Sequence, residues 1–124
     1  MSKAGYKTIF AIATPPGLSA IAVIRISGSL ASDAPALFGA DCPLAGQFSV
    51  ARLVVDQRVI DQVILLFMKA PFSSTGEDVC EIHCHGSRAV IDSLLARLSV
   101  EGGLSMAQPG EFSRRSFMNG KMDL

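Results

Sequence analysis

The sequence lacks an excess of charge of either sign. Eleven Lys and Arg residues balance eleven Asp and Glu residues, so the formal net charge is zero. A free-standing nucleic-acid-binding protein usually carries a strong positive field. The overall charge therefore gives no support to that class, although a larger assembly can carry the positive charge elsewhere.

Long apolar runs and a regular cysteine framework are also missing. The longest apolar stretch, VILLFM at 63–68, is far shorter than the roughly 20 residues that span a bilayer, so we expect a buried strand there. Cys42, Cys80 and Cys84 are odd in number and lack the spacing of a secreted disulfide scaffold. The first residues, MSKAGYKTIF, have no long apolar stretch behind their charges. We therefore expect a cytoplasmic protein with reduced thiols and no membrane partner.

Two motifs of nucleotide and metal chemistry are incomplete. The phosphate-binding pattern G-x-x-x-x-G-K-[ST] does not occur, because FMNGKM lacks both the first glycine and the Ser or Thr, so this chain is expected not to hydrolyse GTP. The only two histidines, His83 and His85, could join Glu81 as three zinc ligands. No fourth ligand stands nearby. We therefore expect no tightly bound zinc, and favour groups that line a cleft or histidines satisfied beneath the next helix.

What the sequence does contain is enough apolar material for one domain. Its 124 residues are 49% hydrophobic, with a mean hydropathy of +0.40. Hydrophobic periodicity predicts an α+β fold of order ββα-βββα, with a mixed sheet packed by two helices. TPPGLS at 14–19 is expected to be a turn, and Pro35 to kink the first helix. The expected strands are 8–13, 20–27, 48–55, 58–68 and 78–84, and the expected helices are 29–40 and 87–99.

The stretch GEDVCEIHCHG at 76–86 is dense in reactive side chains. Successive side chains of a strand point to opposite faces, so the cysteines share one face with Ile82, while Glu81, His83 and His85 share the other with Val79. We expect the cysteines to face the core as small hydrophobes. This separation disfavours a Cys–His catalytic pair within the strand.

Several basic residues lie in unusual surroundings. Arg25 stands inside the apolar run AVIRIS, so its charge must be paired or solvated at an edge, in either a functional or a structural role. Arg114 and Arg115 precede Lys121 in PGEFSRRSFMNGKMDL. On its own, a double arginine is typical of a solvated face.

Three stretches carry a specific pattern: TIFAIATPPGLSAIAVIRISG at 8–28, STGEDVCEIHCHG at 74–86 and PGEFSRRSFMNGKMDL at 109–124. Together they resemble the amino-terminal domain of the tRNA modification GTPase MnmE family, also called TrmE. The resemblance covers almost the whole chain in the family's order and spacing, while the middle contributes little. Ser74 stands where the family usually has an aromatic residue, and Ser87 replaces the second glycine of the usual HGG. The GTP-binding module and the carboxyl-terminal cysteine motif are absent from the chain.

The resemblance implies a folate-binding and dimerisation domain over residues 1–120, with a fold of the type shared by MnmE and the glycine-cleavage T-protein. It implies that 121–124 begin a following helical domain, in keeping with a chain that stops without a closing turn signal. MnmE-family proteins act with the flavoprotein MnmG to add an aminomethyl or carboxymethylaminomethyl group to the wobble uridine of certain tRNAs. The implied partners are a second copy of the chain, MnmG and, through the full complex, tRNA.

The resemblance places the folate contacts on Arg25, Glu81 and Lys121. A carboxylate such as Glu81 suits the adjacent N3–H and 2-amino donors of a reduced pterin. Arg25 and Lys121 suit the tail carboxylates and the carbonyl of 5-formyltetrahydrofolate, and both histidines are expected to line the same cavity. In the full-length family members GTP, Mg²⁺ and K⁺ are further cofactors. No catalytic residue is implied for this chain.

Two other functions are open on the residues alone. One is a stand-alone folate-dependent aminomethyltransferase related to the glycine cleavage system, which would share the ligand. The other is a zinc enzyme that uses Glu81, His83 and His85. The three-motif match favours the MnmE family over both.

Overall fold

The computed structural model describes residues 6–14 and 20–121. The turn expected at 14–19 falls almost entirely outside these residues, as does most of 121–124. The helices are α1 (Arg88–Ser99), α2 (Glu111–Met118) and the short 3-10 helices η2 (Ala31–Asp33) and η3 (Pro35–Phe38). The strands are β1 (Thr8–Ile12), β2 (Ile21–Ser27), β3 (Gln47–Val55), β4 (Arg58–Met68), β5 (Val79–His85) and β6 (Leu104–Met106).

The described strands form one six-stranded mixed sheet in the order β3-β4-β5-β2-β1-β6. Neighbours are antiparallel except for β1 and β6, which run parallel. The hairpin between β3 and β4 turns at Asp56 and Gln57, whose φ angles of 50° and 66° are those of a two-residue turn that matches strand twist. The predicted α+β class and the five predicted strands are confirmed.

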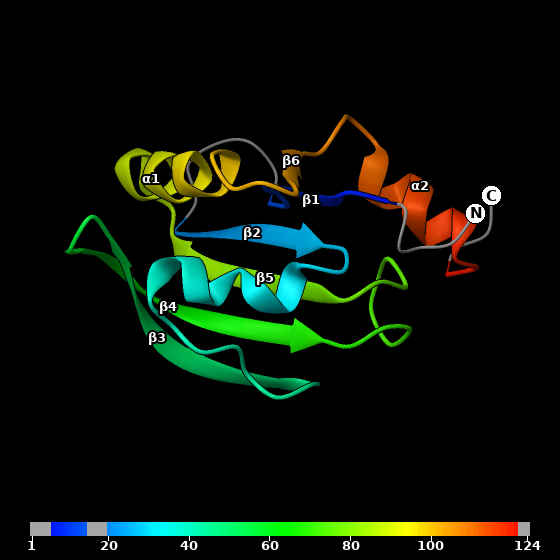
Figure 1. Cartoon of the computed structure of the whole chain (residues 1–124), viewed down its shortest axis with the longest axis horizontal. Coiled ribbons are helices and arrows are strands. Elements are labelled where there is room, and N and C mark those ends of the chain that lie inside the picture. Colours follow the sequence, from blue (N-terminus) through cyan, green and yellow to red (C-terminus); the bar gives the residue numbers. More distant parts are fainter. Residues whose placement is uncertain (1–5, 15–19, 122–124) are drawn as a thin grey trace.

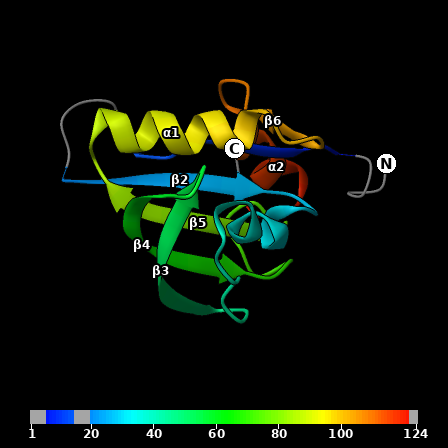
Figure 2. The same cartoon turned by 60° about the vertical axis from the view of Figure 1, so that its left-hand side comes forward.

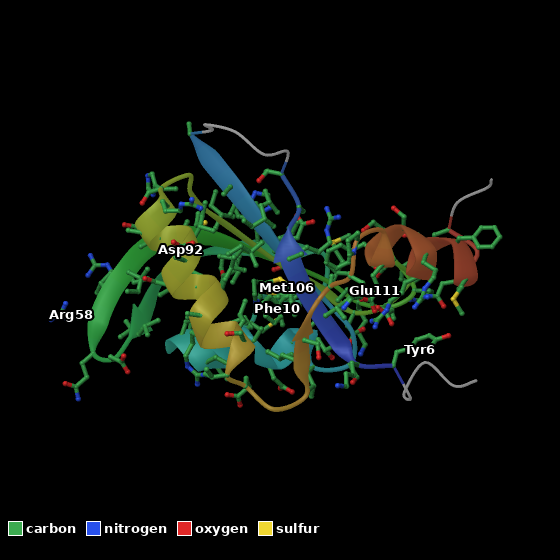
Figure 3. All side chains as sticks on the ribbon, turned by 90° about the horizontal axis from the view of Figure 1, so that it is seen from above. Tyr6, Phe10, Arg58, Asp92, Met106 and Glu111 are labelled. Carbon is green, nitrogen blue, oxygen red and sulfur yellow. The ribbon has the colours of Figure 1, made fainter. Side chains whose placement is uncertain are left out.

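Strand β6 was not predicted from the sequence. It contains three residues, too few for alternation to be recognised, and it pairs with the first residues of β1. Figure 3 shows Phe10 and Met106 together where the two strands meet. The amino-terminal strand therefore lies inside the sheet rather than at its edge.

One face of the sheet carries the hydrophobic core. Helix α1 runs alongside the sheet, and the η2–η3 segment packs on the same core (Figure 2). The even-numbered side chains of β5 face this core, so the cysteines lie where alternation predicted them. The completely buried large apolar side chains include Phe10, Phe38, Ile24, Ile26, Leu53, Leu65, Ile82, Leu94 and Leu98.

The two predicted helices have different outcomes. Helix α1 is confirmed: the Ser87 hydroxyl accepts a hydrogen bond from Val90 N at its start, and Leu94 and Leu98 are buried. The predicted helix at 29–40 is wrong as a continuous α-helix, because two 3-10 helices replace it. Pro35 has no N–H to donate, so it cannot continue the first 3-10 helix and instead begins the second. The prediction of a kink at this position understated the break.

Helix α2 was also missed. It lies beyond the end of the sheet, on the side away from α1 (Figure 1). The buried residues of α2 are Arg115 and Ser116, so the sequence shows no apolar stripe of the kind that identifies an amphipathic helix. No helix in the described part of the chain is long and apolar enough to cross a membrane.

Candidate functional site

The open face of the sheet places Arg25 next to Glu81. The two residues stand opposite each other in the register of β2 and β5. Arg25 Nε donates to Glu81 Oε2 at 2.9 Å, and Arg25 Nη2 lies 2.8 Å from the same oxygen. The Phe112 ring of α2 lies 5.7 Å from the guanidinium carbon of Arg25. Arg25 is therefore paired within its apolar strand, and its partner is Glu81, the carboxylate predicted for the site.

The second oxygen of Glu81 faces His83. His83 Nε2 lies 3.0 Å from Glu81 Oε1, at hydrogen-bonding distance. Burial acts to raise the pKa of Glu81, but the hydrogen bonds from His83 and Arg25 outweigh it and hold the pKa below its ordinary value. Glu81 is therefore an ionised acceptor at neutral pH. Each carboxylate oxygen has two lone pairs, which leaves acceptor capacity beyond the contacts described.

A groove of about 440 Å³ lies over these strands. It is large enough for a small-molecule ligand. Arg25, Glu81 and Lys121 all line it, although they come from β2, β5 and the segment after α2. The structure therefore brings the three sequence-predicted site residues to one place. The other lining residues are Leu66, Met68, Phe72, Ser73, Ser74 and Val79.

The two histidines do not fit the expectation that both line this cavity. Neither is among the residues that line the groove, and His83 approaches it only through Glu81. His85 turns instead to Asp61 of β4: its ring Nδ1 lies 2.7 Å from Asp61 Oδ1, and its backbone N donates to Asp61 Oδ2 at 2.8 Å. In the described parts of the chain, no group of three or more His, Cys, Asp or Glu side chains is placed to hold a metal ion.

A buried ion pair lies beside the groove. Arg115 Nη1 donates to both oxygens of Glu77 at 3.0 and 3.2 Å, and both side chains are only 5% exposed. Arg115 Nη2 donates to Glu111 of the same helix at 3.0 Å, and Ser27 donates to Glu77 at 2.7 Å. The expectation of a solvated double arginine is therefore wrong for Arg115 and right for Arg114, which is exposed.

Neither Glu77 nor Arg115 was predicted as an important residue. The spacing of Glu111 and Arg115, four residues apart, was the available signal, because such a pair shares one helix face. Figure 3 shows Glu111 and Tyr6 near each other at this end of the molecule, where the Tyr6 ring lies 5.3 Å from the Arg115 guanidinium carbon. This network attaches α2 to the sheet.

The loop before β5 is fixed to α2 by its backbone. Ser116 donates to the carbonyl oxygen of Ser74 at 2.6 Å, and Asn119 Nδ2 donates to that of Thr75 at 2.8 Å. Gly76 has a φ of 82°, and a Cβ at this position would lie 2.7 Å from the Asn119 Cβ. Only glycine permits this approach. The Ser27 hydroxyl of the first motif stretch lies 2.8 Å from that of Thr75, so described residues of all three stretches meet here. Lys121, which follows α2, lines the groove.

Comparison with known families decides the assignment. The family model described as "GTP-binding protein TrmE N-terminus" matches residues 8–121. The chain belongs to this family. All three residues predicted for the groove lie within the matched range, and the resemblance inferred from the three motifs is confirmed.

Curated relatives of the family share much of the sequence. The chain is similar to proteins named "tRNA modification GTPase MnmE". It is 47% identical to that of Dinoroseobacter shibae over 94% of the chain, 47% identical to that of Chlamydia caviae over 94%, and 44% identical to that of Anaplasma phagocytophilum over 100%. The alignments cover 27% to 28% of these relatives. The chain thus corresponds to roughly a quarter of the relatives' length.

Proposed function

We propose that this chain is the folate-binding domain of a tRNA modification GTPase and holds 5-formyltetrahydrofolate or a related reduced folate in the groove. The observation that carries the proposal is that Arg25, Glu81 and Lys121, which are far apart in sequence, line one groove. A fold of the type shared with the glycine-cleavage T-protein is part of this proposal.

The chemistry of the groove fits a reduced folate. Ionised Glu81 accepts the N3–H and the 2-amino group of the pterin, either beside its present contacts or in exchange for His83. Arg25 and Lys121 carry positive charge toward the tail carboxylates or the formyl carbonyl. Leu66 and Met68 provide apolar surface for the ring system. The domain thus binds and orients the one-carbon donor.

The rest of the activity belongs to the longer protein. We propose that the domain forms a homodimer and that the full-length protein binds GTP, Mg²⁺ and K⁺. With MnmG it modifies the wobble uridine of tRNA in the cytoplasm. The names of the relatives support tRNA modification and GTP hydrolysis for the whole protein. This chain contributes the folate site.

Calorimetric titration with 5-formyltetrahydrofolate tests the folate site. Glu81→Ala should weaken binding more than His83→Ala, because it leaves two ligand donors unpaired at about 1 to 3 kcal/mol for each. Arg25→Ala and Lys121→Ala should weaken binding in a salt-dependent way. Asp92→Ala is the control, since Asp92 is an exposed acidic residue of α1, far from Glu111 in Figure 3.

Each variant is first checked for native circular dichroism, so that loss of binding is not loss of fold. If Glu81→Ala binds as tightly as the unaltered chain, the pterin is held elsewhere and the proposal fails at that residue. If the unaltered chain does not bind reduced folates at all, the folate site is excluded for this chain.

A further inference from the structure

Phe72 is a large apolar side chain exposed beside the groove. It is 75% exposed, and it lines the groove together with the aliphatic side chains Leu66 and Met68. Among the described residues that line the groove it is the only aromatic one. An exposed phenylalanine does not stabilise the free protein by burial. Its exposure indicates instead a role in binding a ligand or a partner.

The backbone on both sides of Phe72 is held in place. Phe72 N donates to Lys69 O at 2.8 Å, and Ala70 N donates to Asp78 Oδ1 at 2.9 Å. On the other side, the Ser73 hydroxyl donates to the carbonyl oxygen of Glu77. The ring is therefore presented from a fixed turn rather than from a free loop. With the backbone held, only the two side-chain torsions of the phenylalanine remain to be ordered on binding, which keeps the entropic cost small.

The groove has different chemistry on its two sides. Arg25, Glu81 and Lys121 supply charged hydrogen-bonding groups, while Phe72 and Leu66 supply apolar surface. A flat ring with hydrogen-bond donors on one edge fits both sides of the groove. Its edge can donate to the Glu81 carboxylate, while its face packs against the phenyl ring of Phe72. A flexible aliphatic ligand would not use the aromatic ring in this way.

We propose that Phe72 is a ligand-binding residue that stacks on the planar pyrimidine ring of the pterin, the ring whose edge Glu81 holds. This inference rests on the proposed function and adds a specificity: the groove selects ligands by their ring and not only by their charges. Truncation of Phe72 should therefore weaken the binding of ligands that carry the ring. It should leave unchanged the weak binding of a ligand that has only the charged tail.

The chain contains no tryptophan, which provides a direct reporter. Phe72→Trp creates a single tryptophan beside the groove, and we expect 5-formyltetrahydrofolate to quench its emission. Val59→Trp is the control. Val59 is exposed at the far end of β4, next to Arg58, which lies at the opposite end of the molecule from Glu111 in Figure 3. Its emission corrects for light absorbed by the ligand. Adding Glu81→Ala to Phe72→Trp should abolish the quenching at the same ligand concentration.

Calorimetry then measures the contribution of the ring. Phe72→Ala should bind 5-formyltetrahydrofolate about tenfold more weakly, as expected for the loss of one stacked aromatic ring. Phe72→Trp should retain the affinity, and Phe117→Ala, which removes an exposed phenylalanine outside the groove lining, should leave it unchanged. A glutamate-containing dipeptide, which has the tail's carboxylates and no ring, should bind the unaltered chain and Phe72→Ala equally.

The outcomes separate this inference from the proposed function. If Glu81→Ala abolishes folate binding and Phe72→Ala does not weaken it, the folate site stands and the stacking role is overturned. If the emission of the Phe72→Trp variant changes with protein concentration and not with folate, Phe72 belongs to a contact between copies of the chain, and the inference fails. If the unaltered chain binds no reduced folate, both proposals fail together.

Discussion

Burial makes two of the three thiols unreactive. Burial, followed by the nearby Cys42 and Glu81, raises the pKa of Cys80 to about 12, and burial with the charge of Asp61 raises that of Cys84 to about 11. Because the thiolate is the reactive species, iodoacetamide should modify half-buried Cys42 first and the other two only after unfolding. Peptide mapping with and without urea checks this. Rapid labelling of Cys84 in the native protein would contradict it.

The contact between Asp61 and His85 makes stability depend on pH. Burial acts to raise the pKa of Asp61, but hydrogen bonds from the backbone and the ring of His85 lower it below its ordinary value of 3.8. The lower pKa belongs to the folded state, so the ionised carboxylate stabilises the fold at neutral pH, and this contribution is lost as pH falls below about 3.8.

Asp61→Asn should therefore lower the free energy of unfolding by about 1 kcal/mol near neutral pH and have little effect below the folded-state pKa. Urea unfolding of the unaltered protein and of Asp61→Asn, once near neutral pH and once below the folded-state pKa of Asp61, measures the difference. A destabilisation that is equal at both would show that the charge of Asp61 plays no part.

The sequence predicted which face of the sheet each side chain of β5 points to. It did not predict the partners of the polar side chains. The opposite orientation of Cys80 and Glu81 follows from strand geometry alone. The contact of His85 with Asp61 depends on how β4 and β5 pair, and that of Arg115 with Glu77 depends on where α2 docks. No local pattern encodes either of these relations.

At the scale of elements, the attachment of α2 rests on a buried charge pair. Replacing Arg115 by alanine leaves Glu77 buried without its partner, which should lower the free energy of unfolding by about 3 to 5 kcal/mol. Arg114→Ala, the exposed neighbour, should change it by about 0.5 kcal/mol or less. Urea unfolding followed by circular dichroism gives both values.

The double variant Glu77→Gln, Arg115→Met distinguishes a charge effect from a packing effect. It should recover part of the loss, because no buried charge is then left unpaired. Equal losses for Arg115→Ala and Arg114→Ala would mean that the ion pair does not hold α2.

The elements that sequence periodicity revealed are those with apolar faces. Helix α1 was predicted from its apolar stripe, with Leu94 and Leu98 buried as expected. Helix α2 buries polar residues, and β6 has three residues, so neither produces a recognisable period. The groove is bordered by the segment that follows α2. Its assembly could therefore be reached through the family resemblance and not through periodicity.

At the scale of the whole molecule, the open face of the sheet exposes several large apolar side chains. Phe48 and Val50 of β3 are 68% and 61% exposed, and Ile64 opposite Val50 on β4 is 44% exposed. Such a patch is usually covered by a partner. We expect the domain to sediment as a dimer, and Val50→Lys to shift it toward monomer, whereas Val59→Lys at the far hairpin end should not.

Sedimentation equilibrium at several concentrations measures both variants against the unaltered domain. A protein that is monomeric throughout would exclude dimerisation by this domain alone. A dimer that survives Val50→Lys would place the interface on another surface.

The parallel pairing of β1 with β6 has a consequence for how the protein is made. Thr8 pairs with Leu104, so the first strand gains its second neighbour only after most of this domain has been synthesised. Such long-range contacts slow folding, because a large loop must close before they form. The groove is completed later still, because Lys121, which lines it, follows α2. The residues that line the groove therefore come together only when nearly all of this domain has been synthesised.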